Sequence, residues 1–221
     1  MIREIAGLPH RFARPELLEK ALTHRSLGRY NNERLEFLGD SILGTIVSAR
    51  LFEARPDASE GDLTRLRARV VRGDTLARIA TELDLGRHLN LGEGELKSGG
   101  HRRGSILADA LEAVFAAVYL DGGFEAAERV IRHLCDPIIE GLPEAEALKD
   151  PKTRLQEALQ GGGRPLPEYE LLGSSGADHA KTFTVRCRLP DSGETFEATG
   201  GSRRKAEQAA ARHALEALGA S

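Results

Sequence analysis

The chain has 221 residues and a formal net charge of −3, with 40% hydrophobic and 29% charged residues. This composition excludes an intrinsically disordered chain, and no apolar stretch is long enough and free enough of charge to span a membrane. The length suffices for one large domain or two modest domains with buried cores. No signal-peptide pattern precedes the first charged residues, so we expect a cytoplasmic protein.

Residues 1–140 carry helical periodicity almost throughout, and strand signals are lacking there. Glycine, proline and polar breaks separate five predicted helices, which cover 15–27, 32–52, 60–83, 104–120 and 123–140. This part is therefore predicted to be an all-α bundle. A glycine-rich basic loop at 91–105 is predicted to open onto the fourth helix, either as a flexible surface loop or as a contact to a substrate.

The second predicted helix contains the most informative segment, NERLEFLGDSIL at 32–43. Glu33, Glu36 and Asp40 lie three and four residues apart in an otherwise apolar run, so a helix places them on one face. Uncompensated charge in a partly buried site is costly. Carboxylates packed this closely must bind protons, pair with cations or hold a metal ion.

A second acidic pair, Asp109 and Glu112, has i, i+3 spacing on the apolar helix at 104–120. Two such helices can present four oxygen ligands to one point. Hard oxygen ligands without a neighbouring cysteine or a ligand-spaced histidine favour magnesium or manganese over zinc or copper. The pattern is equally compatible with acids that line ordinary solvated helix faces.

The pattern changes after residue 140. Residues 141–150, GLPEAEALKD, lose periodicity and mix glycine, proline and acids, which predicts a linker. Asp150 and Pro151 are predicted to cap a short helix at 152–160, which three glycines end. Three strands are predicted to follow, at 168–175, 181–189 and 194–200, with a hairpin turn at 191–193.

The last predicted helix, 203–218, begins after Ser202 as its N-cap and completes the order α-β-β-β-α. Arg203, Arg204 and Lys205 stand at its start, although helix N-termini favour acidic residues. Three cations there are unfavourable unless an anion binds. A polyphosphate is the natural anion, and a solvated basic turn is the alternative.

These motifs together resemble bacterial ribonuclease III across nearly the whole chain. The resemblance is carried by NERLEFLGDSIL, ILADALEA, DPKTRLQEALQ and GSRRKAEQAAA. It implies an α+β protein with an all-α endonuclease domain at 1–140, a linker at 141–150 and a double-stranded-RNA-binding domain at 151–219. It also implies hydrolysis of double-stranded RNA by a homodimer that uses Mg²⁺, with Mn²⁺ as a substitute. The expected products carry 5′-phosphate and 3′-hydroxyl ends with short 3′ overhangs, and the expected substrates are ribosomal RNA precursors and other structured transcripts.

Residue roles follow from the same resemblance. The implied metal ligands are Glu36, Asp40, Asp109 and Glu112, with Asp40 and Glu112 most closely tied to catalysis. Glu33 and Glu60 are expected to be supporting or RNA-proximal acids. The expected RNA contacts are Gln156, Glu157, His179, Ser202, Arg203, Arg204 and Lys205.

Physical arguments agree with this division. The major groove of an A-form duplex hides its base edges, so binding must read shape, 2′-hydroxyls and phosphates. No histidine or lysine is clearly placed as a general base, which fits catalysis by two metal ions per site. A C2 dimer gives each strand of the duplex its own site, and Phe37 is predicted either to lie in that interface or to pack in the core of one subunit.

Two other classes of protein fit the sequence less well. A protein that only binds double-stranded RNA would keep the second domain and lose acids from the first, yet all four acids are present. A di-iron carboxylate bundle needs Glu-x-x-His motifs, and neither acidic helix has one.

Overall fold

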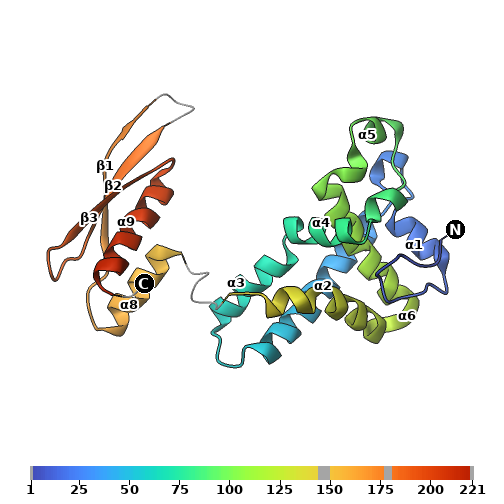
Figure 1. Ribbon diagram of the computed structural model, residues 1–221, viewed down its shortest axis with the longest axis horizontal. Helices are drawn as coiled ribbons and strands as arrows, with labels where there is room; N and C mark the ends of the chain where they lie inside the picture. The colour runs from blue at the N-terminus through green and yellow to red at the C-terminus, as the bar shows by residue number, and fades with distance from the viewer. Residues whose placement is uncertain (1, 144–149, 177–180, 220–221) are drawn as a thin grey trace. The chain divides into compact units, whose positions relative to one another are not determined.

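The computed structural model describes residues 2–143, 150–176 and 181–219, which form two compact units, Met1–Ala145 and Glu146–Ser221 (Figure 1). Most of the predicted linker, residues 144–149, lies outside the described residues, and the predicted domain boundaries stay predictions. None of the described helices is long and apolar enough to cross a membrane.

The first unit is helical, with α2 and α6 packed against each other along its centre (Figure 1). Helices α1 and α4 also pack on α6, and α3 packs on α2. The helices are α1 Pro15–Ala21, α2 Glu33–Ala54, α3 Glu60–Val71, α4 Gly73–Glu82, α5 Glu93–Lys97 and α6 Gly104–Glu140. In the described part of this unit no β-strand is found, so the predicted all-α bundle is confirmed.

Helix α6 supplies most of the core of this unit. Leu111, Val114 and Phe115 are fully buried, and almost every residue from 106 to 118 is buried as well. Burial of such side chains stabilises the fold by roughly 1.5–3 kcal/mol each. The acidic pair of α6 therefore lies on a helix that the fold holds rigidly.

Two predicted helix boundaries were wrong. The helix predicted over 15–27 ends at Ala21, because the next residues pair with Asn90 instead of continuing the helix. The N–H of Asn90 donates to the Leu22 carbonyl at 2.8 Å, and the Asn90 carbonyl accepts from the N–H of His24 at 3.0 Å. A short 3₁₀ helix, η1 Arg25–Leu27, follows. The helix predicted over 60–83 is two helices, because Arg72 adopts extended backbone with ψ of 149° between α3 and α4.

Two segments predicted as separate helices, 104–120 and 123–140, form one run with a kink. The kink lies at Gly123, whose φ of 79° belongs to the left-handed region that glycine adopts without strain. The predicted loop at 91–105 opens onto α6 as expected. It is more ordered than a flexible loop, since it contains α5 and the 3₁₀ helix η3 Gly100–Arg102; another 3₁₀ helix, η2 Leu85–His88, precedes the loop.

The second unit has the predicted α-β-β-β-α order. Its elements are α8 Pro151–Gly161, β1 Glu168–Ser175, β2 Thr182–Arg188, β3 Thr195–Gly200 and α9 Arg203–Ala217. The strands form one antiparallel sheet in the order β1-β2-β3, and both helices contribute to the core beside it. The buried core residues are Leu155, Leu159, Cys187, Leu189, Ala210, Ala211, Ala214 and Leu215.

Both predicted helix caps of this unit are confirmed. The Asp150 carboxylate accepts from the backbone N–H groups of Lys152 and Thr153 at 3.0 and 3.2 Å, at the start of α8. The Ser202 hydroxyl accepts from the N–H of Lys205 at 3.2 Å, at the start of α9. Each cap satisfies N–H groups that the first turn of a helix leaves unpaired.

Candidate active site

The two acidic motifs meet where α2 crosses α6, and Gly39 permits this crossing. A Cβ atom at Gly39 would lie 1.8 Å from the carbonyl oxygen of Glu112, closer than any two such atoms can approach. Only glycine therefore allows the backbones to pack at this distance. Because Glu36 and Asp40 flank Gly39 on α2, the close approach brings both acids toward Glu112 on α6.

Three of the four predicted metal ligands converge. One carboxylate oxygen from each of Glu36, Asp109 and Glu112 lies within 4.8 Å of the others, and all three side chains are partly buried. We call these three residues the acidic cluster. Asp40, the fourth predicted ligand, is exposed and lies outside this group, but its charge acts on both Glu36 and Glu112.

The pKa values of all three acids in the acidic cluster are raised above their ordinary values. Burial raises the pKa of Glu112 to about 8, and the charges of Asp40, Glu36 and Asp109 add to this rise. Burial is also the largest cause of the raised pKa of Glu36, and the negative charges of Asp109 and Glu33 raise this pKa further. A divalent cation would remove this repulsion, so the oxygen-only donor set fits a hard metal ion.

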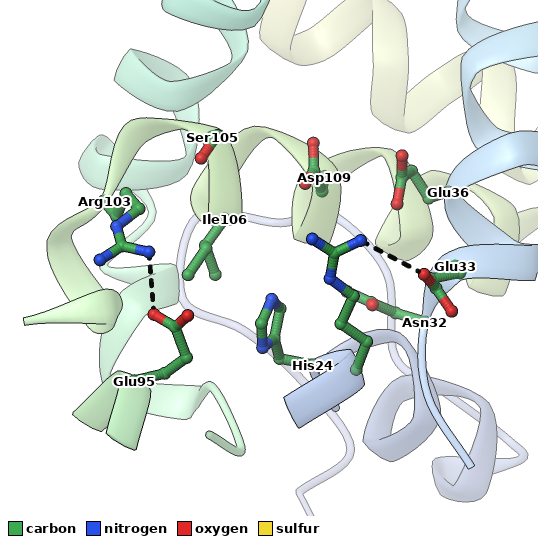
Figure 2. A pocket seen from close by; sticks show the side chains of 10 residues that line it. His24, Asn32, Glu33, Glu36, Glu95, Arg103, Ser105, Ile106 and Asp109 are labelled. Atoms are coloured by element: carbon green, nitrogen blue, oxygen red, sulfur yellow. Dashed lines mark ion pairs between the residues drawn. The ribbon is translucent and has the colours of Figure 1, made fainter. Parts of the chain in front are cut away.

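The acidic cluster borders a pocket of about 280 Å³ (Figure 2). The Arg103 guanidinium pairs with Glu95 at 3.0 Å on one side, and the Arg25 guanidinium lies 3.7 Å from Glu33 on the other. Burial raises the pKa of Asp109, whereas His24 and Arg25 act to lower it. The lining residues are His24, Arg25, Asn32, Glu33, Glu36, Glu95, Arg103, Ser105, Ile106 and Asp109.

Sequence reasoning placed Glu33 near the acids but did not single out His24 or Arg25. Their only signal was position, since they lie near the end of the helix predicted over 15–27 and precede the acidic motif by fewer than ten residues. Glu60 is not brought to the acidic cluster within one chain. It begins α3, accepts a hydrogen bond from the Thr64 hydroxyl at 2.9 Å, and lines a different pocket with Phe52.

The predicted RNA contacts of the second unit lie on two helices. Gln156 and Glu157 are exposed on α8, and Arg203, Arg204 and Lys205 are exposed in the first turn of α9. His179 lies outside the described residues. Among the residues that the structure describes, neither Arg204 nor Lys205 forms an ion pair, so both cations remain available to an anion.

One acid joins these two helices. The Glu207 carboxylate on α9 accepts from the Lys152 ammonium of α8 at 2.6 Å and from the Arg203 guanidinium at 2.9 Å. The same ammonium lies over the ring of Tyr169, 4.3 Å from its centroid. The starts of α8 and α9 are therefore held together by charge as well as by the apolar core.

A helical unit with an acidic pocket, followed by an α-β-β-β-α unit with a basic helix start, defines a nuclease with its own RNA-binding module. Comparison with known proteins agrees. Residues 14–138 match the family model described as ribonuclease-III-like, and residues 151–218 match the double-stranded RNA binding motif. The chain belongs to the ribonuclease III family.

Curated relatives and solved structures give the same result. The chain is 57% identical over 211 residues to Ribonuclease 3 of Alkalilimnicola ehrlichii, which covers 96% of this chain and 92% of the relative. It is 56% identical over 212 residues to Ribonuclease 3 of Thiobacillus denitrificans, covering 96% and 94%. The solved nuclease domain of ribonuclease III from Campylobacter jejuni is 43% identical, with a TM-score of 0.58 over 59% of this chain and 92% of that chain. The protein is thus an endoribonuclease, a hydrolase that acts on double-stranded RNA, from a family that depends on divalent metal ions.

Proposed function

We propose that the pocket beside the acidic cluster cuts RNA duplexes by Mg²⁺-dependent hydrolysis and leaves 5′-phosphate and 3′-hydroxyl ends. The observation that carries this proposal is the convergence of Glu36, Asp109 and Glu112, whose oxygens lie within 4.8 Å of one another. Their raised pKa values mark a site that is stable as a trianion only with a cation. Mn²⁺, which favours the same oxygen ligands, is expected to substitute for Mg²⁺.

In this proposal the chain's own residues set the geometry. Glu36, Asp109 and Glu112 would hold the metal ion, and Asp40, which is exposed on α2, would add a fourth negative charge beside them. Bound divalent ions supply activation of water and stabilisation of the leaving 3′-oxygen, and we expect two per site at full activity. The rigid crossing at Gly39 keeps the carboxylates in place without reorganisation during the reaction.

The direct test uses a long RNA duplex with and without Mg²⁺, followed by analysis of the product ends. We expect cleavage only with the metal, and 5′-phosphate ends. Glu112→Gln should retain duplex binding and lose cleavage by orders of magnitude. Glu125→Gln, on the exposed face of the same helix, is the matched control and should cleave normally. Undiminished cleavage by Glu112→Gln would refute the assigned role.

Duplex recognition is assigned to residues 151–219, which the proposed linker 141–150 joins to a catalytic domain at 1–140. Gln156 and Glu157 would contact a minor groove from α8. The start of α9, with Ser202 as its cap, would meet phosphates across the intervening major groove. The exposure of these side chains supports the assignment. His179 would reach a neighbouring minor groove, as the family resemblance implies.

A homodimer is part of the same proposal. The Phe37 side chain is 78% exposed, which contradicts the alternative that it packs in the core of one subunit, and Phe52 on the same face of α2 is 71% exposed. Two exposed phenylalanines on one helix face favour burial against a second copy. The Campylobacter jejuni structure is described as having a region involved in dimer formation of its nuclease domain. Sedimentation of Phe37→Glu should show a shift toward monomer, and an unchanged dimer would exclude this face.

The expected physiological substrates are ribosomal RNA precursors and other structured transcripts in the cytoplasm. Shape readout supports a broad range of duplexes, because the protein contacts backbone and 2′-hydroxyls rather than base edges. Accumulation of unprocessed ribosomal precursors in cells that lack the protein is the expected result. Normal precursor processing in such cells would confine the function to other transcripts.

A further inference from the structure

The histidine of the pocket, His24, is held unusually firmly for a residue outside a regular helix. Its backbone N–H donates to the Asn90 carbonyl at 3.0 Å, and the preceding residue forms a bridge with Asn90. Its ring nitrogen Nδ1 lies 3.2 Å from the backbone nitrogen of Ser26 and 2.9 Å from the Ser26 hydroxyl. Two separate segments of the chain therefore fix one imidazole ring.

This arrangement selects one tautomer of His24. The backbone N–H of Ser26 can only donate, so Nδ1 must accept and carries no proton. The Ser26 hydroxyl oxygen accepts from the N–H of Gly92 at 2.8 Å, which leaves its own proton to donate to Nδ1 as well. A neutral imidazole with an accepting Nδ1 holds its proton on Nε2.

The segment at Gly92 packs too closely for any other residue. A Cβ atom at Gly92 would lie 2.9 Å from the Ser26 carbonyl oxygen and 3.1 Å from its hydroxyl oxygen. The close approach brings the Gly92 N–H within hydrogen-bonding distance of Ser26. The orientation of His24 is thus built into the fold on both sides of Ser26.

His24 and Asp109 line the same pocket, where burial raises the pKa of Asp109 and His24 acts to lower it. Figure 2 shows the ring of His24 projecting into the pocket, with Ile106 and Asp109 across from it. Arg25 lines the same pocket; its side chain is 71% exposed and its guanidinium lies 3.7 Å from Glu33. The pocket therefore combines a hydrogen-bond donor and a cation with carboxylates that could hold a metal ion.

A phosphate group would fit this combination, since its oxygens accept hydrogen bonds and could also bind a metal ion that the acids would hold. We propose that His24, through Nε2–H, and Arg25 bind a non-bridging phosphate oxygen of the RNA strand that is cut in this pocket. This inference rests on the proposed metal-dependent hydrolysis at the acidic cluster. His24 acts as a fixed hydrogen-bond donor and not as a base, because Nδ1 accepts from Ser26 and Nε2 already carries hydrogen, so neither ring nitrogen is free to accept a proton.

The sharpest variant is His24→Asn. The amide oxygen of the shorter asparagine side chain can replace Nδ1 as the acceptor for the Ser26 N–H, which keeps the N-cap of η1. The donor at Nε2 is lost. We expect kcat on an RNA duplex to fall about 100-fold, with KM and the metal concentration for half-maximal activity little changed. His133→Asn, the same change on an exposed face of α6, is the matched control and should leave kcat unchanged.

His24→Gln provides the rescue arm. Its longer side chain returns an amide donor to about the reach of Nε2, so we expect a kcat between those of the wild type and His24→Asn. Thermal melting curves of His24→Asn, His24→Gln and His133→Asn show whether each variant is folded, so that a fall in kcat is not caused by unfolding. Equal kcat in the wild type and in folded His24→Asn overturns the proposal, and so does a large rise in the metal requirement, because that would make His24 a metal ligand.

Phosphorothioate RNA separates phosphate binding from a purely structural role. A phosphorothioate carries sulfur in place of one of the two non-bridging oxygens, which gives two diastereomers. With Mn²⁺ present, the wild type should cleave more slowly the diastereomer whose sulfur replaces the oxygen bound by His24. His24→Asn should lose this discrimination, and an unchanged diastereomer ratio would contradict the contact. Failure of the proposed function is distinguishable, because it would appear as full cleavage by Glu112→Gln whatever the His24 variants do.

Discussion

Two glutamates, Glu112 in the helical unit and Glu207 in the RNA-binding unit, are both partly buried and have opposite electrostatics. Burial raises the pKa of Glu112 to about 8, and neighbouring carboxylates add to the rise. Burial of Glu207 acts in the same direction, but hydrogen bonds from Lys152 and Arg203 outweigh it and lower the pKa. Glu207 has its cations within the fold. Glu112 has acids as its charged neighbours, so it keeps a proton near neutral pH unless a cation, such as the proposed metal ion, binds beside it.

The contrast depends first on the crossing of α2 and α6, which Gly39→Ala should break. The added Cβ would overlap the Glu112 carbonyl, so the helices must separate, and we expect a loss of about 3 kcal/mol or more in the free energy of unfolding. The better helix propensity of alanine offsets only about 1 kcal/mol. Urea unfolding measures the change, and metal-dependent cleavage should fall with it.

Gly61→Ala is the matched control for that variant. Its Cβ would meet only the Arg65 guanidinium, at an ordinary 3.5 Å, inside α3. We expect stability to rise by up to about 1 kcal/mol. If both variants behave alike, the close approach at Gly39 does not decide the position of the acids.

The second prediction concerns pH and follows from the sign of the Glu112 shift. Between pH of about 4.5 and about 8, metal-free folded protein holds a proton that the unfolded chain has released, so stability falls as pH rises through this window. Metal binding must displace that proton, and metal affinity should therefore increase with pH up to about 8. Unfolding with a chelator and metal titrations at several pH values measure both trends, and Glu112→Gln should flatten them.

Glu207 gives the opposite sign and sharpens the test. Its lowered pKa contributes stability above the unfolded value of 4.5, and this contribution is lost as pH falls through the folded pKa. A lower pH should thus destabilise the RNA-binding unit, whereas it should stabilise the metal-free helical unit by protonating the acidic cluster. A common pH trend in both units would contradict the comparison.

The third prediction tests the start of α9. Lys205→Ala removes a cation that is exposed and unpaired within the described part of the chain, so binding should weaken by about 1 kcal/mol on unrelated duplexes alike. The slope of log affinity against log salt should become shallower by about one unit. Binding titrations at several salt concentrations measure both effects. A loss confined to one sequence would contradict shape readout.

The smallest effect is expected for Glu207→Gln, which removes the charge that pairs with Lys152 and Arg203. The pairs lie 2.6 and 2.9 Å apart at the edge of the core, with the glutamate side chain 12% exposed. We expect a loss of about 1 kcal/mol in the stability of the RNA-binding unit. Thermal unfolding measures it, with Glu216→Gln on the exposed face of α9 as control. No change would show that the apolar core alone joins α8 and α9.

Periodicity, cap residues and motif spacing determined the element order, both caps of the second unit and the acidic face of α2, because these features depend on residues close together in the chain. The C-terminal end of α1 and the division between α3 and α4 were missed, since pairing with Asn90 and the extended Arg72 override local helix preference. Only the tertiary structure decided that Glu36, Asp109 and Glu112 converge while Glu60 does not. It alone placed His24 and Arg25 in one pocket with Glu36 and Asp109, because the packing of distant segments sets those distances.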